Sequence, residues 1–198
     1  MAMISANTLV RSIALFHLTL AVVLLKNPVL VSNQGVILLL GESMQLVRIP
    51  SLSPYIHILS EPPNTYQPTP RDFNKPSAAT AFLAVLFAFI GLTDLTALSL
   101  HEDVFDQFWG LQAPVRLLFL FGLTAYSYIF KEGGMFAPRG MEYRMSAGAS
   151  LNNSFIFTWG FIEVFAWFWV FTTLREERSA KATKMAEKQA READQNTL

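Results

Sequence analysis

Otherwise apolar stretches of the sequence are interrupted by four ionisable side chains: His17, Asp94, Arg116 and Glu163. Imidazole, carboxylate and guanidinium groups can carry protons, bind ions or form ion pairs, so any chemistry of these stretches would depend on them. If the stretches cross a membrane, each charged group near the centre of a helix costs about 2.5–3.5 kcal/mol on insertion scales. We therefore expect these side chains to pair with one another and to point into a helical bundle.

Their positions along the apolar stretches predict two pairs. Asp94 lies six residues before Leu100, where its stretch ends, and is therefore about 9 Å deep at roughly 1.5 Å per residue. Arg116 lies four residues into the next stretch, about 6 Å deep from the same face, which predicts an Asp94–Arg116 ion pair. His17 and Glu163 each lie near the middle of their stretches, so we expect a hydrogen bond between them.

Small residues share helix faces with these groups, and small residues allow membrane helices to approach closely. Three sets support inward-pointing polar groups: Ala14 and Ala21 beside His17, Ala84, Ala88 and Gly91 beside Asp94, and Gly160 and Ala166 beside Glu163.

Three roles are open for the polar groups. They can lock the bundle together or dock a partner subunit, which we expect because the sequence shows no recognisable chemistry. They can line a proton or ion path, with His17 and Glu163 in a small carrier or channel, although transporters usually have more spans. They can serve a lipid-modifying enzyme at headgroup level, where only Asp94, Arg116 and the acids of segment 101–106 qualify.

Two further signals predict no site. His101, Glu102, Asp103 and Asp106 could bind a metal, but acids at a helix start are explained by the helix dipole. The sequon Asn152–Ser154 adjoins an apolar stretch, so we expect no oligosaccharide there. With no cysteine and no HExxH motif, we expect no enzyme, no cofactor and no metal site.

The elements that position these residues follow from composition. Hydrophobic residues make up 52% of the chain and charged residues 15%, against about 25% charge in soluble domains, and zero net charge gives no reason to expect nucleic acid as a partner. We predict an all-α polytopic membrane bundle with a lipid bilayer around it. It comprises four spans (9–25, 77–100, 112–130 and 153–174), interfacial helices at 35–46 and 102–111, a proline-rich loop at 50–76 and a charged helical tail at 175–198.

Topology follows from the ends of the spans. The first apolar run is followed by Lys26-Asn27-Pro28 rather than a small-residue cleavage site, so we expect a retained helix and not a signal peptide. Basic residues are balanced over the whole chain, with seven on each side of the predicted membrane. Six of them directly follow the last span, and this local density favours a cytosolic C-terminus. They are Arg175, Arg178, Lys181, Lys184, Lys188 and Arg191.

Four segments resemble the fungal "increased loss of mitochondrial DNA" protein family: ALFHLTLAVVLLKNPVLV, GLTDLTAL, PVRLLFLFGLTAYSYIF and IFTWGFIEVFAWFWVFTTLREER. The resemblance covers residues 9 to 178 and is clearest at Asp94, Pro114–Leu118, Glu163 and Arg175–Glu177. It implies a small multi-pass protein of the endoplasmic reticulum membrane. The family's name records a mitochondrial-genome maintenance phenotype, and no catalytic residues are established that could be carried over.

Together these observations predict a non-catalytic endoplasmic reticulum protein, acting as an accessory or adaptor subunit of a larger membrane assembly. A membrane-protein partner is expected from the aromatic fourth span and the interfacial segments. The carrier or channel, and the lipid-modifying enzyme, remain the alternatives.

Overall fold

The computed structural model describes residues 4–32, 34–43, 77–130 and 151–196, and helices dominate these ranges. In chain order the helices are α1 (Ala6–Lys26), α2 (Pro28–Ser32), α3 (Gly35–Ser43), α4 (Ala78–Ala97), α5 (Glu102–Ile129) and α7 (Ser154–Asn196). Four of them, α1, α4, α5 and α7, are long and apolar enough to cross a membrane. The predicted all-α fold with four potential spans is therefore confirmed.

Polar caps begin the first two spans. The Ser5 hydroxyl accepts a hydrogen bond from the backbone N–H of Thr8 at 3.3 Å, at the start of α1. At α4, Ser77 and Thr80 form a capping box in which each side chain accepts from the other's backbone N–H. These caps satisfy N–H groups that a helix start leaves unpaired, which matters most where the surroundings are apolar.

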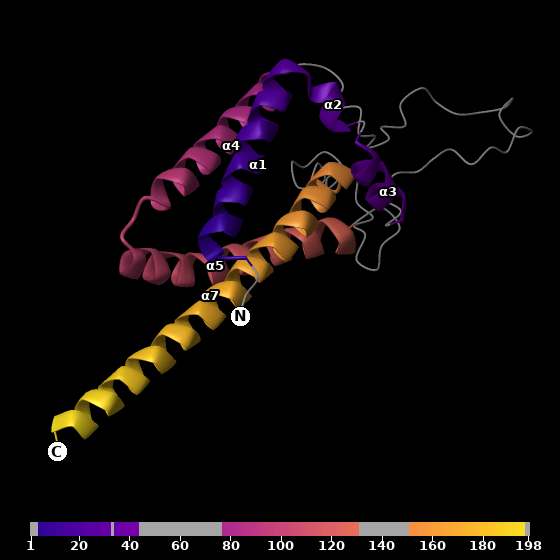
Figure 1. Cartoon of the computed structure of the whole chain (residues 1–198). Coiled ribbons are helices and arrows are strands. Elements are labelled where there is room, and N and C mark those ends of the chain that lie inside the picture. Colours follow the sequence, from indigo (N-terminus) through magenta and orange to yellow (C-terminus); the bar gives the residue numbers. More distant parts are fainter. Residues whose placement is uncertain (1–3, 33, 44–76, 131–150, 197–198) are drawn as a thin grey trace, which may run out of the picture.

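The long helices form two closely packed pairs, α1 with α4 and α5 with α7, and α1 also contacts α7. Figure 1 shows α1 and α4 side by side, with α5 passing their lower ends and α7 extending well beyond the bundle. The α5–α7 pair is antiparallel along its length: the Asn152 amide donates to the carbonyl of Phe130 at one end, and Lys181 bonds Asp106 at the other.

Contacts between α1 and α7 place the two termini on the same side of the bundle. The backbone N–H of Ala6 donates to a carboxylate oxygen of Glu177 at 3.0 Å, so the start of α1 meets the far end of the apolar part of α7. This side also carries the turn between α4 and α5, and below it is called the tail side. Lys26, at the end of α1, lies on the opposite side.

The structure differs from the prediction at α5. The predicted interfacial helix at 102–111 and the predicted span at 112–130 are one continuous helix, Glu102–Ile129, with Pro114 inside it rather than in its first turn. A break at Pro114 would expose several backbone groups to hydrocarbon, whereas continuity leaves only the carbonyl of Gly110 without its helical donor. The acidic first turn of α5 extends beyond the apolar section, against α7.

The remaining elements also differ in detail from the sequence prediction. The fourth span and the charged tail form a single helix of 43 residues, because alanine, lysine and glutamate after Leu174 continue it by propensity. The short helix α2 was not predicted. It begins with Pro28, a residue suited to the first turn of a helix. The proline-rich loop at 50–76 lies outside the described residues, as do positions 44–46 of the predicted helix at 35–46.

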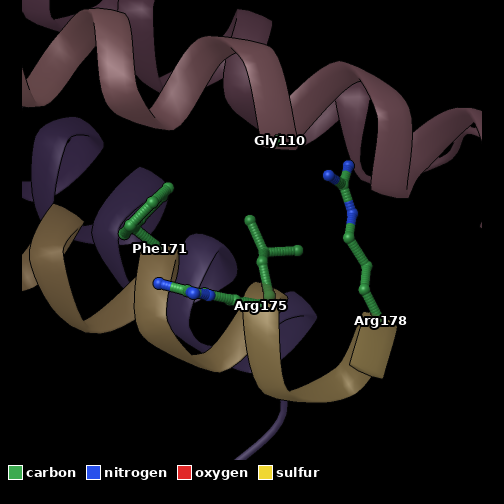
Figure 2. Close-up of a pocket in the computed structure, with 5 residues that line it drawn as sticks. Gly110, Phe171, Arg175 and Arg178 are labelled. Carbon is green, nitrogen blue, oxygen red and sulfur yellow. The ribbon is translucent and has the colours of Figure 1, made fainter. Parts of the chain in front are cut away.

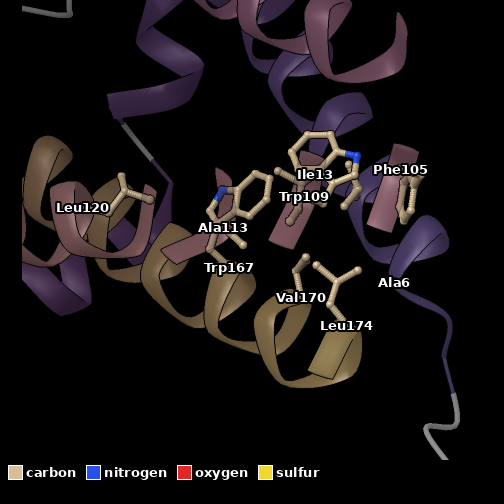
Figure 3. Close-up of a cluster of buried hydrophobic side chains, with 10 residues drawn as sticks. Ala6, Ile13, Phe105, Trp109, Ala113, Leu120, Trp167, Val170 and Leu174 are labelled. Carbon is tan, nitrogen blue, oxygen red and sulfur yellow. The ribbon is translucent and has the colours of Figure 1, made fainter. Parts of the chain in front are cut away.

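The core at the tail side joins α1, α5 and α7, and Figure 3 shows its side chains converging between these helices. Its largest members are Trp109 and Trp167, whose rings are stacked with centroids 5.4 Å apart. Large apolar side chains such as Leu118, which is 77% exposed, cover the outside. This inside-out distribution is what a bilayer around the bundle requires, and the protein is a multi-pass membrane protein.

Candidate functional site

The structure brings Asp94 and Arg116 together in a two-pronged ion pair. The Arg116 nitrogens Nη1 and Nη2 donate to Asp94 Oδ2 and Oδ1 at 2.8 and 2.7 Å. The Asp94 side chain is 2% exposed and that of Arg116 22%. Parallel hydrogen bonds between guanidinium and carboxylate are the strongest arrangement of such a pair, so the charges of α4 and α5 satisfy each other.

Two tryptophan rings flank the guanidinium of Arg116. Its Cζ lies 4.5 Å from the ring centroid of Trp167 and 5.3 Å from that of Trp109. A cation over an indole face is stabilised by the ring quadrupole, more strongly where water is excluded. Sequence reasoning missed both tryptophans as partners. Their spacing from Arg116 and Glu163 was the available signal, but it does not reveal which helix faces which.

Trp167 connects this ion pair to the second predicted pair. Its indole Nε1–H donates to Glu163 Oε2 at 3.0 Å, within one turn of α7. Glu163 Oε1 lies 3.1 Å from Nε2 of His17, and both side chains are 3% exposed. The relative orientation of these two groups does not allow a hydrogen bond, and neither ring nitrogen of His17 has a hydrogen-bond partner in the described part of the chain. The two residues are therefore close, but the predicted hydrogen bond between them is not formed.

The four predicted residues thus belong to one connected network that crosses the bundle. It runs from Asp94 of α4 through Arg116 of α5 and Trp167 of α7 to Glu163, and reaches His17 of α1. The His17 ring stacks on the ring of Phe87 in α4, with the two centroids 5.7 Å apart, so the network begins and ends at α4. Glu163 lies nine residues from Ser154 and eleven from Leu174, about 14 and 16 Å, so the Glu163 end of the network is close to mid-membrane.

A groove between α1 and α7 gives access to this network from the surface of the bundle. It has a volume of about 240 Å³ and is apolar except for Ser12 and Glu163. Its lining residues are Leu9, Ser12, Ile13, Phe16, Ile162, Glu163, Ala166 and Trp169. Glu163 therefore stands at the boundary between the incompletely satisfied histidine and the membrane-facing surface.

A separate polar cluster joins α5 and α7 outside the apolar sections, on the tail side. Lys181 Nζ lies 2.5 Å from Asp106 and 2.6 Å from Glu102. Hydrogen bonds to Asp106 and Glu102 raise the pKa of Lys181, and the hydrogen bond from Lys181 lowers the pKa of Glu102. The predicted metal candidates at 101–106 are thus divided between this cluster and solvent. No metal-binding group of three His, Cys, Asp or Glu side chains occurs among the described residues.

The sequon at Asn152 adjoins the start of α7, as the sequence indicated. Its side-chain amide donates to the carbonyl of Phe130 at 2.9 Å and so closes the α5–α7 pair opposite the tail side. An amide held in this way caps a helix end, which is a structural use of the side chain.

Comparison with known proteins identifies the family. Residues 4–60 and 65–184 match the family described as increased loss of mitochondrial DNA protein 1, Ilm1. No curated protein matches the chain, and neither does any solved structure. The match covers both polar pairs, α1, α4 and α5 in full, and α7 as far as residue 184, so the chain belongs to the Ilm1 family.

Proposed function

We propose that this protein is a non-catalytic accessory subunit of the endoplasmic reticulum membrane that docks a transmembrane helix of a partner protein in the α1–α7 groove. The family's name ties its members to loss of mitochondrial DNA. An adaptor accounts for such a phenotype through the partner it stabilises, without chemistry of its own. The observation that carries the proposal is the unequal satisfaction of the two polar pairs.

The Asp94–Arg116 pair is complete within the chain, with two short hydrogen bonds and two flanking rings. The His17–Glu163 pair is not, since both nitrogens of His17 lack a hydrogen-bond partner among the described residues. A buried polar group without a partner costs about 1–3 kcal/mol, so such groups are retained where something else completes them. Glu163 lines the groove, and its remaining hydrogen-bonding capacity is available from that side.

The groove suits side chains of a neighbouring helix better than a larger ligand. Its volume of about 240 Å³ lies below the range of roughly 300–1,000 Å³ that is typical of small-molecule pockets. Ser12 and Ala166 are small and lie in its walls, which allows a helix backbone to approach. An acyl chain cannot donate a hydrogen bond to Glu163, whereas a lysine, arginine or asparagine on a partner helix can.

The length of the first span supports a location in the endoplasmic reticulum membrane. The 14 residues between Arg11 and Lys26 extend about 21 Å as a helix. The endoplasmic reticulum bilayer has a hydrocarbon thickness of about 27 Å, which is thinner than that of the plasma membrane. The flexible side chains of Arg11 and Lys26 can extend from the two ends of this helix to the polar interfaces of such a bilayer more easily than to those of a thicker one.

Site-specific crosslinking tests the docking surface. A photoreactive residue at Phe16, in the groove wall, should crosslink to one partner in native membranes, and one at Phe119 on α5 should not. Both side chains face outward, so Phe119 is the matched control. Glu163→Gln keeps the size of the side chain but removes its charge, and should reduce the Phe16 crosslink several-fold while the abundance of the protein is unchanged.

Any of four results would refute the proposal. The first is purification in mild detergent of a lone monomer with no stoichiometric partner. The second is equal crosslinking at Phe16 and Phe119. The third is loss of proton or ion flux in Glu163→Gln vesicles, which would instead establish the carrier that His17 and Glu163 could form. Turnover of phospholipid by the purified chain would establish the lipid-modifying enzyme.

A further inference from the structure

A second hollow lies between α5 and α7, at the tail-side end of the apolar part of α7. It has a volume of about 120 Å³ and is lined by Gly110, Phe171, Leu174, Arg175 and Arg178. Figure 2 shows the Arg178 side chain reaching from α7 towards Gly110, while the Arg175 side chain extends back along α7 towards Phe171. Apolar groups thus form one part of the hollow and two guanidinium groups form its rim.

Gly110 makes room for the Arg178 guanidinium. A Cβ at position 110 would lie only 2.0 Å from Nη2 of Arg178 and 2.4 Å from its Cζ, so any other residue would displace this group. Real carbon–nitrogen contacts are far longer, and the guanidinium is the movable end of a flexible side chain. The glycine therefore determines where the charge of Arg178 is held.

Both arginines are free of ion pairs within the part of the chain that the structure describes. Two acidic groups of α5 and α7 are engaged elsewhere: Glu177 accepts from the backbone of Ala6, and Asp106 pairs with Lys181. The lining of the hollow contains no carboxylate. Arg175 and Arg178 both line the hollow, and guanidinium groups without an ion pair among the described residues are suited to an anion with several oxygen acceptors.

We propose that this hollow binds the phosphate of an anionic phospholipid. Leu174 is the last residue of the apolar run of α7, and the densely charged tail begins at Arg175, so the rim lies at the depth of lipid headgroups. The phosphate accepts hydrogen bonds from Arg175 and Arg178, and the adjoining acyl chains pack on Phe171 and the apolar flank of α5. Basic pockets between membrane helices are a recurrent form of headgroup site.

Native mass spectrometry of the full chain in detergent tests this site. Phosphatidic acid and phosphatidylcholine with the same acyl chains are titrated separately, with inorganic phosphate as competitor. Each of Arg175→Gln and Arg178→Gln should weaken phosphatidic acid binding about fivefold, from about 1 kcal/mol per basic residue near a membrane surface. Arg191→Gln, in the same helix but far from the hollow, is the matched control and should leave binding unchanged.

Gly110→Ala provides an independent test, because it keeps both arginines and displaces only the Arg178 guanidinium. It should weaken binding about as much as Arg178→Gln. The site is disproved if the double variant Arg175→Gln/Arg178→Gln binds like the unaltered chain, or if Arg191→Gln loses as much. Full competition by inorganic phosphate would show that the anion is free phosphate and not a lipid. Circular dichroism of each variant must match that of the unaltered chain.

Discussion

Breaking the Asp94–Arg116 pair from either side should destabilise the bundle by unequal amounts. Arg116→Met leaves the Asp94 carboxylate without its partner at 2% exposure. Loss of one member of a buried pair costs about 3–5 kcal/mol, because the remaining charge is uncompensated. Asp94→Asn leaves the guanidinium at 22% exposure, with two tryptophan rings still beside it.

The rings of Trp109 and Trp167 determine how much less Asp94→Asn should destabilise the bundle than Arg116→Met. A cation over an indole with water excluded is stabilised by about 2 kcal/mol, and this contribution survives in Asp94→Asn. We therefore expect a loss of about 1–3 kcal/mol for Asp94→Asn, against about 3–5 kcal/mol for Arg116→Met. The double variant should cost about 1–3 kcal/mol less than the sum of the two, because the groups contact each other directly.

Equilibrium unfolding of the full chain in mixed micelles, with increasing dodecyl sulfate and detection by far-ultraviolet circular dichroism, measures these free energies. Leu118→Ala is the control: this side chain is two positions from Arg116 and 77% exposed, and its loss should change stability by no more than about 0.5 kcal/mol. Additive single variants, or an Arg116→Met chain at least as stable as Asp94→Asn, would contradict the assigned role of the pair.

Three further outcomes can be measured in the same system. Gly91→Ala should destabilise the chain by about 1–3 kcal/mol relative to Gly122→Ala, because its Cβ would lie 2.9 Å from a backbone carbonyl of α1, whereas a Cβ at Gly122 would have no described atom within 4 Å. Equal unfolding midpoints would contradict this packing. Glu177→Ala removes the acceptor at the start of α1 and should cost about 0.5–2 kcal/mol, with faster amide exchange confined to the first turn as the check. The pairing of Glu102 with Lys181 lowers the pKa of Glu102 and raises that of Lys181. It therefore stabilises the folded chain fully between their usual pKa values of 4.5 and 10.5, and this stabilisation is lost as the pH falls through the lowered pKa or rises through the raised one. A spin-label distance between the first turn of α5 and α7 that does not change at either extreme of pH would refute this role.

The depth of each ionisable residue within its apolar run could be estimated from the sequence, and these depths were sufficient to predict which residues lie close together. Asp94 and Arg116 could be assigned to similar levels by counting residues from the ends of apolar runs, and the structure places them in contact. The same reasoning brought His17 to Glu163. Counting could not show that His17 would form no hydrogen bond to any described residue, since that depends on the angle between two side chains from different helices.

Helix boundaries were predicted where a cap or proline marked them and missed where packing overrode the local signal. Lys26 ends α1 one residue beyond the predicted limit, just before the expected stop at Pro28. Pro114 was expected to begin a helix and instead lies within α5. Contacts of α5 with α7 on both sides of the proline, together with the need to keep backbone groups paired in hydrocarbon, maintain a single helix there.

The sequence alone determined that the chain is a membrane protein with four potential spans, because the length of an apolar run and its few charges depend on local composition only. It also determined which ionisable groups would need partners. Only the tertiary structure decided that Trp167 would join the two pairs into one network and that Glu163 would border a groove. It likewise decided that Gly110 would hold the charge of Arg178. These features depend on the rotation of each helix about its axis and on the choice of neighbours, which are set by side-chain packing between segments far apart in the chain.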